Sequence, residues 1–189
     1  LTCKGIVFHI IDDFETFKST NDLNDSNLNG YQEKHGLVVS TKKGNNFGTV
    51  AAADIEQAFI DGNVEKYTDT ETSNGYKLTQ ILVGTENLGF IALNNHTEKL
   101  NNSTAWYAPS FNELKYLIQG ENTQTGSTSG QEYINKQLKK INADELAGTI
   151  PSVTFYNGVG DHGLRLMTGG SENGWHGIPG EAFYPICAF

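Results

Sequence analysis

The residue types best suited to ligand chemistry gather in a glycine-rich stretch between Tyr156 and Glu181. Trp175 lies there in a segment without apolar periodicity, and an aromatic side chain on a loop can contact a ligand directly. The alternative is that Trp175 covers the core. Aromatic, amide and cationic side chains together favour a polar recognition surface. The ligand-binding residues predicted from this stretch are Tyr156, Asn157, His162, Arg165, Trp175 and His176.

The same stretch contains side chains that could bind a metal ion. Calcium requires several oxygen ligands, whereas a histidine–aspartate site would suit a transition metal. The spacing around His162 and His176 fits no known pattern, and acidic loops are usually solvated, so we expect no cofactor, with calcium as the alternative. The oxygen-bearing side chains that adjacent loops could supply to calcium are Asp161, Glu172, Asn173 and Glu181.

The sequence contains no motif for nucleophilic catalysis. It lacks a Gly-x-Ser-x-Gly turn, and nothing near Cys187 in the sequence would stabilise a thiolate. Acidic residues are plentiful, but their number alone does not indicate the carboxylate pair of a glycoside hydrolase. We therefore expect a protein that is not an enzyme.

Composition and charge narrow the class of partner. The 189 residues include 22 acidic and 13 basic ones, which gives a formal net charge of −9 at pH 7. Binding to nucleic acid or to an anionic membrane needs a basic surface, so the partner we expect is an extracellular glycan or a surface protein. No apolar run approaches the ~20 residues of a membrane helix, and we expect no membrane insertion of this domain. The 21 glycines favour a loop-rich fold.

Cys3 and Cys187 lie near opposite ends of the chain. In an exported protein, two such cysteines predict one disulfide that ties the termini together, and closing so long a loop would stabilise the fold by ~4 kcal/mol. Two buried free thiols are the alternative. The chain begins at Leu1, and we expect that an upstream signal, tether or domain has been removed.

The elements that must position these residues can be read from the hydrophobic pattern. Runs of β-branched and aromatic residues predict strands at Gly5–Ile11 and His35–Ser40, paired antiparallel across a loop at Thr16–Tyr31. Apolar residues at helical spacing predict helices at Ala51–Ile60 and Gly75–Val83. The first half of the chain therefore combines two strands with two short helices.

A capping box begins the next predicted helix. The Ser110 side chain can accept a hydrogen bond from the amide of Glu113, whose carboxylate reaches back, and Gly120 ends the helix. A second amphipathic helix is predicted at Gln131–Leu146. The strands predicted after Pro151 are short and separated by glycines: Ser152–Tyr156, Leu164–Thr168 and Phe183–Phe189.

Four segments, in order along nearly the whole chain, resemble a known family. They are the strand that starts Gly5-Ile-Val-Phe, the strand Lys34-His-Gly-Leu-Val-Val, the motif Trp106-Tyr-Ala-Pro-Ser-Phe-Asn-Glu-Leu, and the run from Ile134-Asn-Lys-Gln-Leu to Tyr184-Pro-Ile-Cys-Ala-Phe. The third segment is similar to a Trp-x-x-Pro-Ser-x-x-Glu-Leu pattern. On these residues the chain resembles the Fibrobacter succinogenes major paralogous domain family of gut-bacterial surface proteins.

This resemblance implies a C-type-lectin-like fold, related to those of sulfatase-modifying enzymes, retroelement variable proteins and some pilus-tip modules. In the retroelement relatives the diversified residues precede the final strand, which by resemblance corresponds to Tyr156–Glu181 here. Trp106 and the capped helix after it then belong to the scaffold, with Trp106 as a core anchor. Stacking of Trp106 on a sugar is the alternative.

The chain departs from the family pattern at two places. Val153-Thr-Phe-Tyr-Asn stands where the family has a Trp-Ser-Ser-Thr run, and Tyr184-Pro185 stands where an Arg-Pro pair is common. The Glu-Pro-Asn and Trp-Asn-Asp triplets that bind calcium and sugar in C-type lectins are absent. Ligand chemistry is therefore not carried over from the family.

We expect residues 1–189 to form a single α+β, C-type-lectin-like domain, the C-terminal part of a longer exported protein. It would have paired terminal strands, flanking helices and a loop-rich C-terminal region. Its predicted function is adhesin-like recognition of an extracellular ligand by a bacterial surface or pilus-associated protein. We expect it to be secreted or anchored to the outer membrane as a lipoprotein. The alternatives are a structural pilus or envelope subunit module with no ligand, and an enzyme related to sulfatase-modifying factors.

Overall fold

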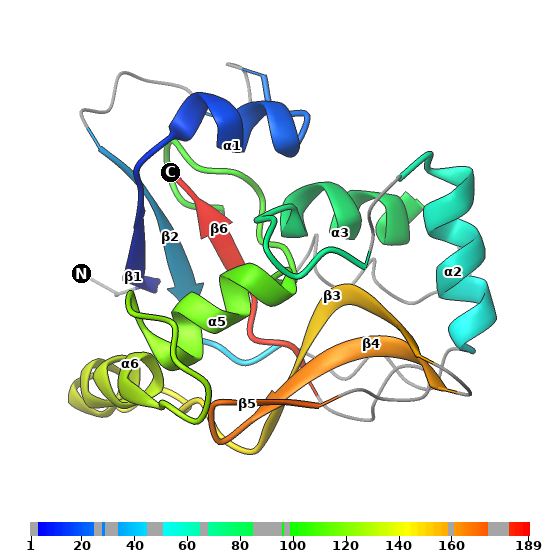
Figure 1. Ribbon diagram of the computed structural model, residues 1–189. Coiled ribbons are helices and arrows are strands. Elements are labelled where there is room, and N and C mark those ends of the chain that lie inside the picture. The colour runs from blue at the N-terminus through cyan, green and yellow to red at the C-terminus, as the bar shows by residue number, and fades with distance from the viewer. Residues whose placement is uncertain are drawn as a thin grey trace.

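Two three-stranded antiparallel sheets, with helices packed around them, make up the described part of the protein, a computed structural model shown in Figure 1. The structure describes residues 4–24, 28, 34–44, 51–64, 68–84, 96, 99–158, 161–173 and 182–189. The predicted α+β architecture of helices and antiparallel strands is confirmed. None of the helices in these residues is long and apolar enough to cross a membrane.

The first sheet joins strands from both ends of the chain. β1 (Gly5–Ile11) pairs antiparallel with β2 (His35–Ser40), as predicted, and β2 pairs with β6 (Ile186–Ala188) on its other side. The prediction that the terminal strands pair with each other is wrong, because β2 lies between them. Residues 37–39 of β2 are apolar and buried, and a run that is covered on both faces favours the centre of a sheet.

A short helix, α1 (Phe14–Thr20), occupies part of the segment predicted as a loop at Thr16–Tyr31. Asp13 caps the helix, because its carboxylate accepts hydrogen bonds from the amide and the hydroxyl of Thr16 at 3.0 and 2.7 Å. Phe17 is buried against β2. A helix this short depends on tertiary packing, so its own sequence carries little signal.

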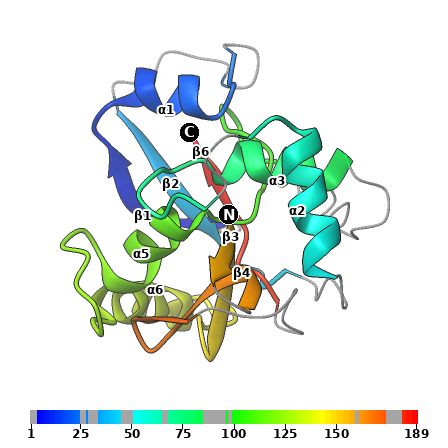
Figure 2. The same cartoon turned by 45° about the vertical axis from the view of Figure 1, so that its right-hand side comes forward.

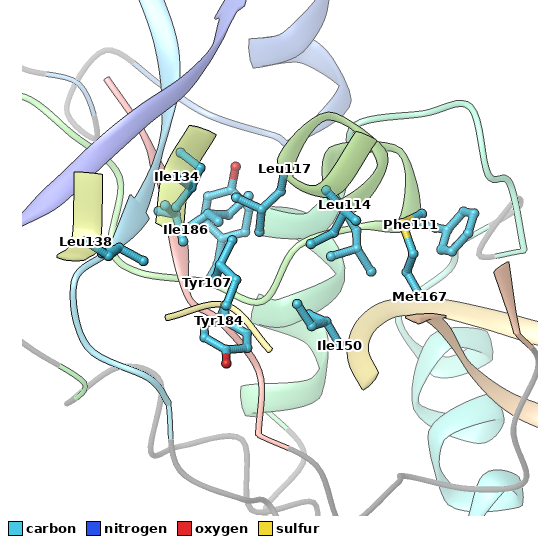
Figure 3. Close-up of a cluster of buried hydrophobic side chains, with 13 residues drawn as sticks. Tyr107, Phe111, Leu114, Leu117, Ile134, Leu138, Ile150, Met167, Tyr184 and Ile186 are labelled. Atoms are coloured by element: carbon cyan, nitrogen blue, oxygen red, sulfur yellow. The ribbon is translucent and has the colours of Figure 1, made fainter. Parts of the chain in front are cut away.

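α5 (Phe111–Gln119) begins with the predicted capping box. The Ser110 hydroxyl accepts the amide hydrogen of Glu113, and the Glu113 carboxylate accepts the amide of Ser110 at 2.7 Å. Gly120, with a φ of +85°, ends the helix. α5 packs against α6 (Ser129–Lys140) and the first sheet. The buried cluster that they form, shown in Figure 3, includes Tyr107, Leu114, Leu117, Ile134 and Ile186.

α6 begins two residues earlier and ends six residues earlier than the helix predicted at Gln131–Leu146. Asn142 has a left-handed φ of 53°, a conformation that does not continue a helix. The chain then folds back, because the Asn135 side chain bonds both the amide and the carbonyl of Leu146, at 2.7 and 2.9 Å. Ile141 is consequently exposed, while Leu146 still reaches the core.

The second sheet contains β3 (Thr149–Gly158), β4 (Asp161–Thr168) and β5 (Ser171–Asn173), paired in that order. β3 and β4 contain two of the predicted strands, and β5 was not predicted. α2 (Ala52–Asp61) and α3 (Gly75–Gly84) lie close to their predicted positions and pack on this sheet (Figures 1 and 2). The buried side chains between them include Ile55, Phe59, Leu78, Leu82, Val153, Phe155 and Leu164.

A short segment before α5 joins the two sheets. Tyr107 exchanges backbone hydrogen bonds with Ile186 of β6, each at 2.8 Å. The amide of Val153 in β3 donates to the carbonyl of Pro109 at 2.9 Å. Trp106 is 2% exposed and packs in a buried cluster, so its predicted place in the core is confirmed.

Candidate functional site

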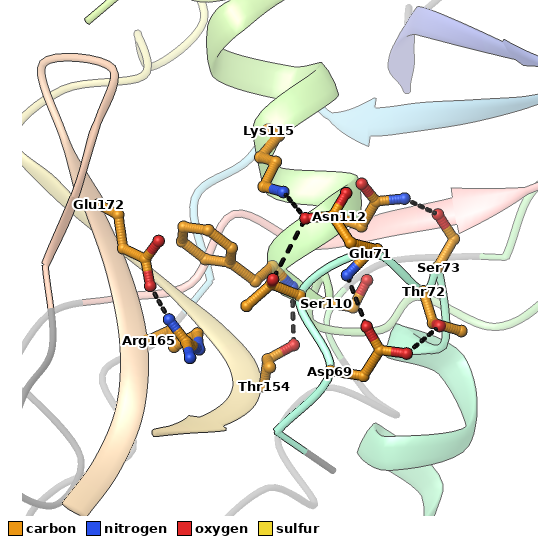
Figure 4. A network of polar contacts seen from close by, with 12 residues as sticks. Asp69, Glu71, Thr72, Ser73, Ser110, Asn112, Lys115, Thr154, Arg165 and Glu172 are labelled. Atoms are coloured by element: carbon orange, nitrogen blue, oxygen red, sulfur yellow. Dashed lines mark hydrogen bonds and ion pairs between the residues drawn. The ribbon is translucent and has the colours of Figure 1, made fainter. Parts of the chain in front are cut away.

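Two of the predicted ligand-binding residues lie in contact on the second sheet. The guanidinium of Arg165 in β4 lies over the Tyr156 ring of β3, 5.2 Å from its centroid, and over the Phe111 ring at 5.7 Å. It also forms an ion pair with Glu172 of β5 (Figure 4). Burial lowers the pKa of Arg165, but an arginine remains charged at neutral pH. Arg165 therefore already has two rings and one carboxylate as partners.

The other four predicted residues are only partly described by the structure. Asn157 is exposed near the end of β3, opposite His162 in the pairing of β3 with β4. The side chain of His162, and the whole of Trp175 and His176, lie outside the described residues. The ligand surface predicted from this stretch therefore stays a prediction.

The calcium alternative gains no support from the part of the chain that the structure describes. No group of three or more His, Cys, Asp or Glu side chains in that part is placed to hold a metal ion. Glu172 pairs with Arg165, and the Asn173 amide donates to a backbone carbonyl. The Asp161 side chain and the whole of Glu181 lie outside the described residues.

Cys187 lies in β6 as a fully buried free thiol. Burial raises its pKa to about 12, so the thiol stays protonated near neutral pH and is a poor nucleophile. Cys3 lies outside the described residues. The structure therefore does not support the predicted disulfide between the two cysteines.

A cleft with a volume of about 300 Å³ opens between α1, β1, α5 and the segment before α3. We call it the His9 cleft. Apolar and polar groups line it together, which is typical of small-ligand sites. Its apolar lining residues are Ile11, Phe17 and Leu37, its polar ones are Asp13, Thr16, Thr20, Glu71, Thr72, Ser73 and Asn112, and its two polar rings are those of His9 and Tyr116.

His9 and Tyr116 form a stacked pair in this cleft. Their ring centroids lie 3.9 Å apart and the ring planes differ by 13°. Nδ1 of His9 lies 3.0 Å from a carboxylate oxygen of Glu121, which helps to fix the ring. A β-bulge between Val7 and His9 shifts the pairing so that His9 lies opposite Leu37. Because a shift of one residue turns a side chain to the other face of a sheet, the bulge places His9 on the side of α5.

Ion pairs and hydrogen bonds fix the polar groups of the cleft. Lys115 donates to Glu71 at 2.6 Å, and this bond lowers the pKa of the Glu71 carboxyl. Asn112 donates to the Ser73 hydroxyl at 3.1 Å (Figure 4). The backbone amide and the hydroxyl at the start of α1 lower the pKa of Asp13. Both carboxylates are therefore charged at neutral pH and can accept hydrogen bonds from a ligand.

Asn21 holds α1 against the opposite wall of the cleft. Its amide donates to the Phe17 carbonyl at 3.1 Å and to the Ser73 carbonyl at 2.8 Å. Its amide oxygen accepts the backbone amide of Lys77 in α3 at 3.2 Å. Asn21 is buried, so these bonds fix the width of the cleft without exposure to competing water.

The sequence alone does not predict the His9 cleft, although weak signals are present. His9 interrupts an apolar strand, and Asn112 and Tyr116 lie four residues apart on the less buried side of α5. The lining residues come from positions 9–20, 37, 71–73 and 112–116. Because these positions are distant in sequence, only the fold brings them together.

No family model matches the sequence, and no curated protein matches it. A similar solved structure is the crystal structure of a fimbrial protein from Bacteroides ovatus ATCC 8483 at 1.85 Å resolution. The TM-score is 0.60 and the identity is 18%, and the match covers 98% of this chain and 44% of the fimbrial protein. At this identity the likeness concerns the fold alone. The chain therefore shares a fold with less than half of a fimbrial protein, and its predicted membership of the Fibrobacter succinogenes family is not confirmed.

Proposed function

We propose that this chain is an adhesin-like domain that recognises an extracellular glycan in the His9 cleft. The observation that carries the proposal is the stacked pair of His9 and Tyr116 in a cleft lined by hydroxyl, amide and carboxylate groups. The flat face of an aromatic ring suits the apolar C–H face of a sugar. The polar groups around it suit the hydroxyls of the sugar and would fix its orientation.

The charges around the cleft favour a neutral ligand. Asp13 and Glu71 line the cleft, Glu121 contacts His9 beside it, and Lys115 is already paired with Glu71. The whole chain carries a formal charge of −9. A sialylated or sulfated glycan would meet like charge on approach, so a neutral glycan is the class of ligand that we expect.

The likeness to a fimbrial protein supports a surface or pilus-associated setting for this function. We also propose that the chain has a C-type-lectin-like fold. We propose further that it is part of a longer exported protein, which is secreted or anchored at the cell surface. The described helices contribute no membrane span.

A structural role in a pilus or envelope assembly is the second candidate. Among the described strands, β1 lies at the edge of the first sheet, and the edge of a sheet can accept a strand from another chain. Val7 and Ile10 of β1, each 43% exposed, and Tyr133 of α6, 54% exposed, line a groove of about 400 Å³ beside this edge. The bulge in β1 interrupts regular pairing, so we rank this role second.

A glycan array, followed by calorimetric titration of the neutral glycan that binds best, tests the proposal. Tyr116→Ala removes the stacking surface, and we expect the affinity to fall at least about tenfold, or ~1.4 kcal/mol. Tyr133→Ala is the matched control, because this exposed tyrosine lies outside the cleft. The control should bind as the unaltered protein does.

Three other outcomes would separate the alternatives. Binding that survives Tyr116→Ala unchanged would rule out the cleft as the site. If the same binding is lost in Trp175→Ala, the site is instead the glycine-rich stretch predicted from the sequence. If no glycan binds, and a pilus subunit binds the unaltered protein but not Val7→Asp, the structural role is favoured.

A further inference from the structure

A second hollow, with a volume of about 450 Å³, lies beside the His9 cleft. Thr20 of α1 and Thr72 line both hollows, so the two meet at these threonines. We call the second one the Asn74 pocket. Asp69, Asn74 and Lys77 are among the polar residues that line it.

Asn74 is 8% exposed, and its amide oxygen has no hydrogen-bond partner among the described residues. A buried amide oxygen left unpaired costs about 1–3 kcal/mol, and such an atom in a folded protein needs an explanation. The side chain lines the pocket. Rotation about the Cβ–Cγ bond of Asn74 would turn its amide oxygen toward the hollow. Because this oxygen has no hydrogen-bond partner in the described part of the chain, the rotation would cost it no hydrogen bond there.

The fold explains why the Asn74 amide does not serve as a helix cap. Asn74 directly precedes α3, at the position where an asparagine side chain commonly accepts the third amide of a helix. Here that third amide, from Lys77, donates to Asn21 instead, at 3.2 Å. Because Asn21 supplies the cap from the end of α1, the Asn74 amide oxygen is left without the partner that a capping asparagine would have.

The neighbouring groups suit the hydroxyls of a sugar. The Asp69 carboxylate accepts the Glu71 amide at 2.8 Å and the Thr72 hydroxyl at 2.6 Å, which fixes this wall of the pocket (Figure 4). Nζ of Lys77 pairs with Asp22 at 2.9 Å, and an ammonium has three hydrogens to donate. Amide and ammonium together provide the donors and the acceptor that a hydroxyl can use.

We infer that the Asn74 pocket is a second sugar subsite, and that the protein binds consecutive units of a neutral oligosaccharide across both hollows. This inference rests on the proposed function of the His9 cleft. The two hollows, of about 300 and 450 Å³, adjoin each other and share Thr20 and Thr72 as lining residues. The threonines at their junction would contact the link between the two bound sugars.

Calorimetric titration with oligosaccharides of increasing length tests this inference. The ligands are neutral gluco- and manno-oligosaccharides of one to six units, and elongated forms of any neutral glycan selected by the array. We expect the affinity to rise at least about tenfold once the chain is long enough to occupy both hollows. Asn74→Ala should abolish this rise and leave the affinity for the shortest bound chain unchanged. Asn101→Ala, at an exposed asparagine outside both hollows, is the matched control.

Lys77→Met gives a second test that keeps most of the side-chain stem, in case Asn74→Ala loosens the start of α3. Thermal unfolding of both variants shows whether the fold is kept. Two results would overturn the second subsite: the unaltered protein binds all chain lengths equally well, or the rise in affinity with chain length is undiminished in both variants. Neither result affects the proposed function, provided that binding still depends on Tyr116. If no neutral glycan binds, or if binding is insensitive to Tyr116→Ala, the proposed function itself fails.

Discussion

Glu113 lies fully buried where two helices begin. Its carboxylate accepts the amide of Ser110 and the hydroxyl of Tyr107, at 2.7 and 3.1 Å, and also the amide of Gly75 at the start of α3. A Cβ at position 75 would collide with this carboxylate, so only glycine allows the close approach. One side chain therefore connects α3, α5 and the segment that joins the two sheets.

Burial raises the pKa of Glu113 from 4.5 to about 7, although its hydrogen bonds oppose the shift. Between these pH values the folded protein keeps a proton that the unfolded chain releases. The free energy of unfolding should therefore fall as the pH rises from 4.5 to about 7. A shift of this size corresponds to about 3 kcal/mol. Urea denaturation at a series of pH values measures the change.

Glu113→Gln should flatten this pH profile. The glutamine oxygen can still accept the two backbone amides, and its NH₂ group can donate to the Tyr107 hydroxyl, so the fold should be kept. Glu132→Gln, at an exposed side chain in the first turn of α6, should retain the pH dependence. The same slope in Glu113→Gln as in the unaltered protein would show that a different group titrates.

The sequence predicts the contact between Tyr156 and Arg165 in the glycine-rich stretch better than it predicts the His9 cleft. Tyr156 and Arg165 can be assigned to one patch from their chemistry and their place in the glycine-rich stretch, and they do lie in contact. The stacking of His9 on Tyr116 depends on the bulge in β1 and on the packing of α5. Local sequence encodes the type of a side chain, whereas the face on which it lies depends on strand register.

At the level of elements, α5 and α6 approach each other closely where one ends and the other begins. A Cβ on Gly130 would lie 2.7 Å from the Gly120 amide nitrogen and from the Leu117 carbonyl oxygen, and 2.8 Å from the Tyr116 carbonyl oxygen. These neighbours are backbone atoms, which cannot rotate away as the end of a side chain can. The crossing of the two helices therefore requires glycine at this position.

Gly130→Ala should destabilise the protein by about 1–3 kcal/mol, the usual cost of overpacking. Gly84→Ala is the control, because a Cβ at the end of α3 would meet no atom of the described residues within 4 Å. The control should change the free energy of unfolding by less than about 0.5 kcal/mol. Guanidinium denaturation of both variants gives the comparison, and equal effects would mean that α6 can shift freely to admit the methyl group.

Elements with a local signal are the ones that the sequence predicts. The capping box predicts the start of α5 because both of its hydrogen bonds join Ser110 and Glu113, three residues apart. α1 depends on the packing of Phe17 against β2, and the three exposed residues of β5 form a strand only by pairing with β4. The central place of β2 likewise depends on contacts between residues that are distant in sequence.

For the molecule as a whole, the predicted disulfide and the structure lead to different expectations. Cys187 is a free thiol, and burial raises its pKa to about 12. We therefore expect both cysteines of the chain to react with a thiol reagent after unfolding without reductant. In the folded protein Cys187 should react slowly, because it must first be exposed by opening of β6. Ellman titration with and without guanidinium measures both quantities.

Cys3→Ser isolates the reaction of Cys187, since the chain has two cysteines. Labelling of this variant should be slow in buffer and fast in guanidinium. The disulfide would be established instead if the unaltered chain shows no reactive thiol after unfolding and its mass is two hydrogens lower than that of the reduced chain.

The position of β2 between β1 and β6 has a mechanical consequence. Both outer strands run antiparallel to β2, so the chain enters the sheet at Gly5 on one end and leaves it at Ala188 on the opposite end. Tension between the termini therefore acts along the strands and across their hydrogen bonds. Within each ladder the hydrogen bonds would resist this shear together instead of opening one after another. A domain pulled at these two points would carry the load through this sheet.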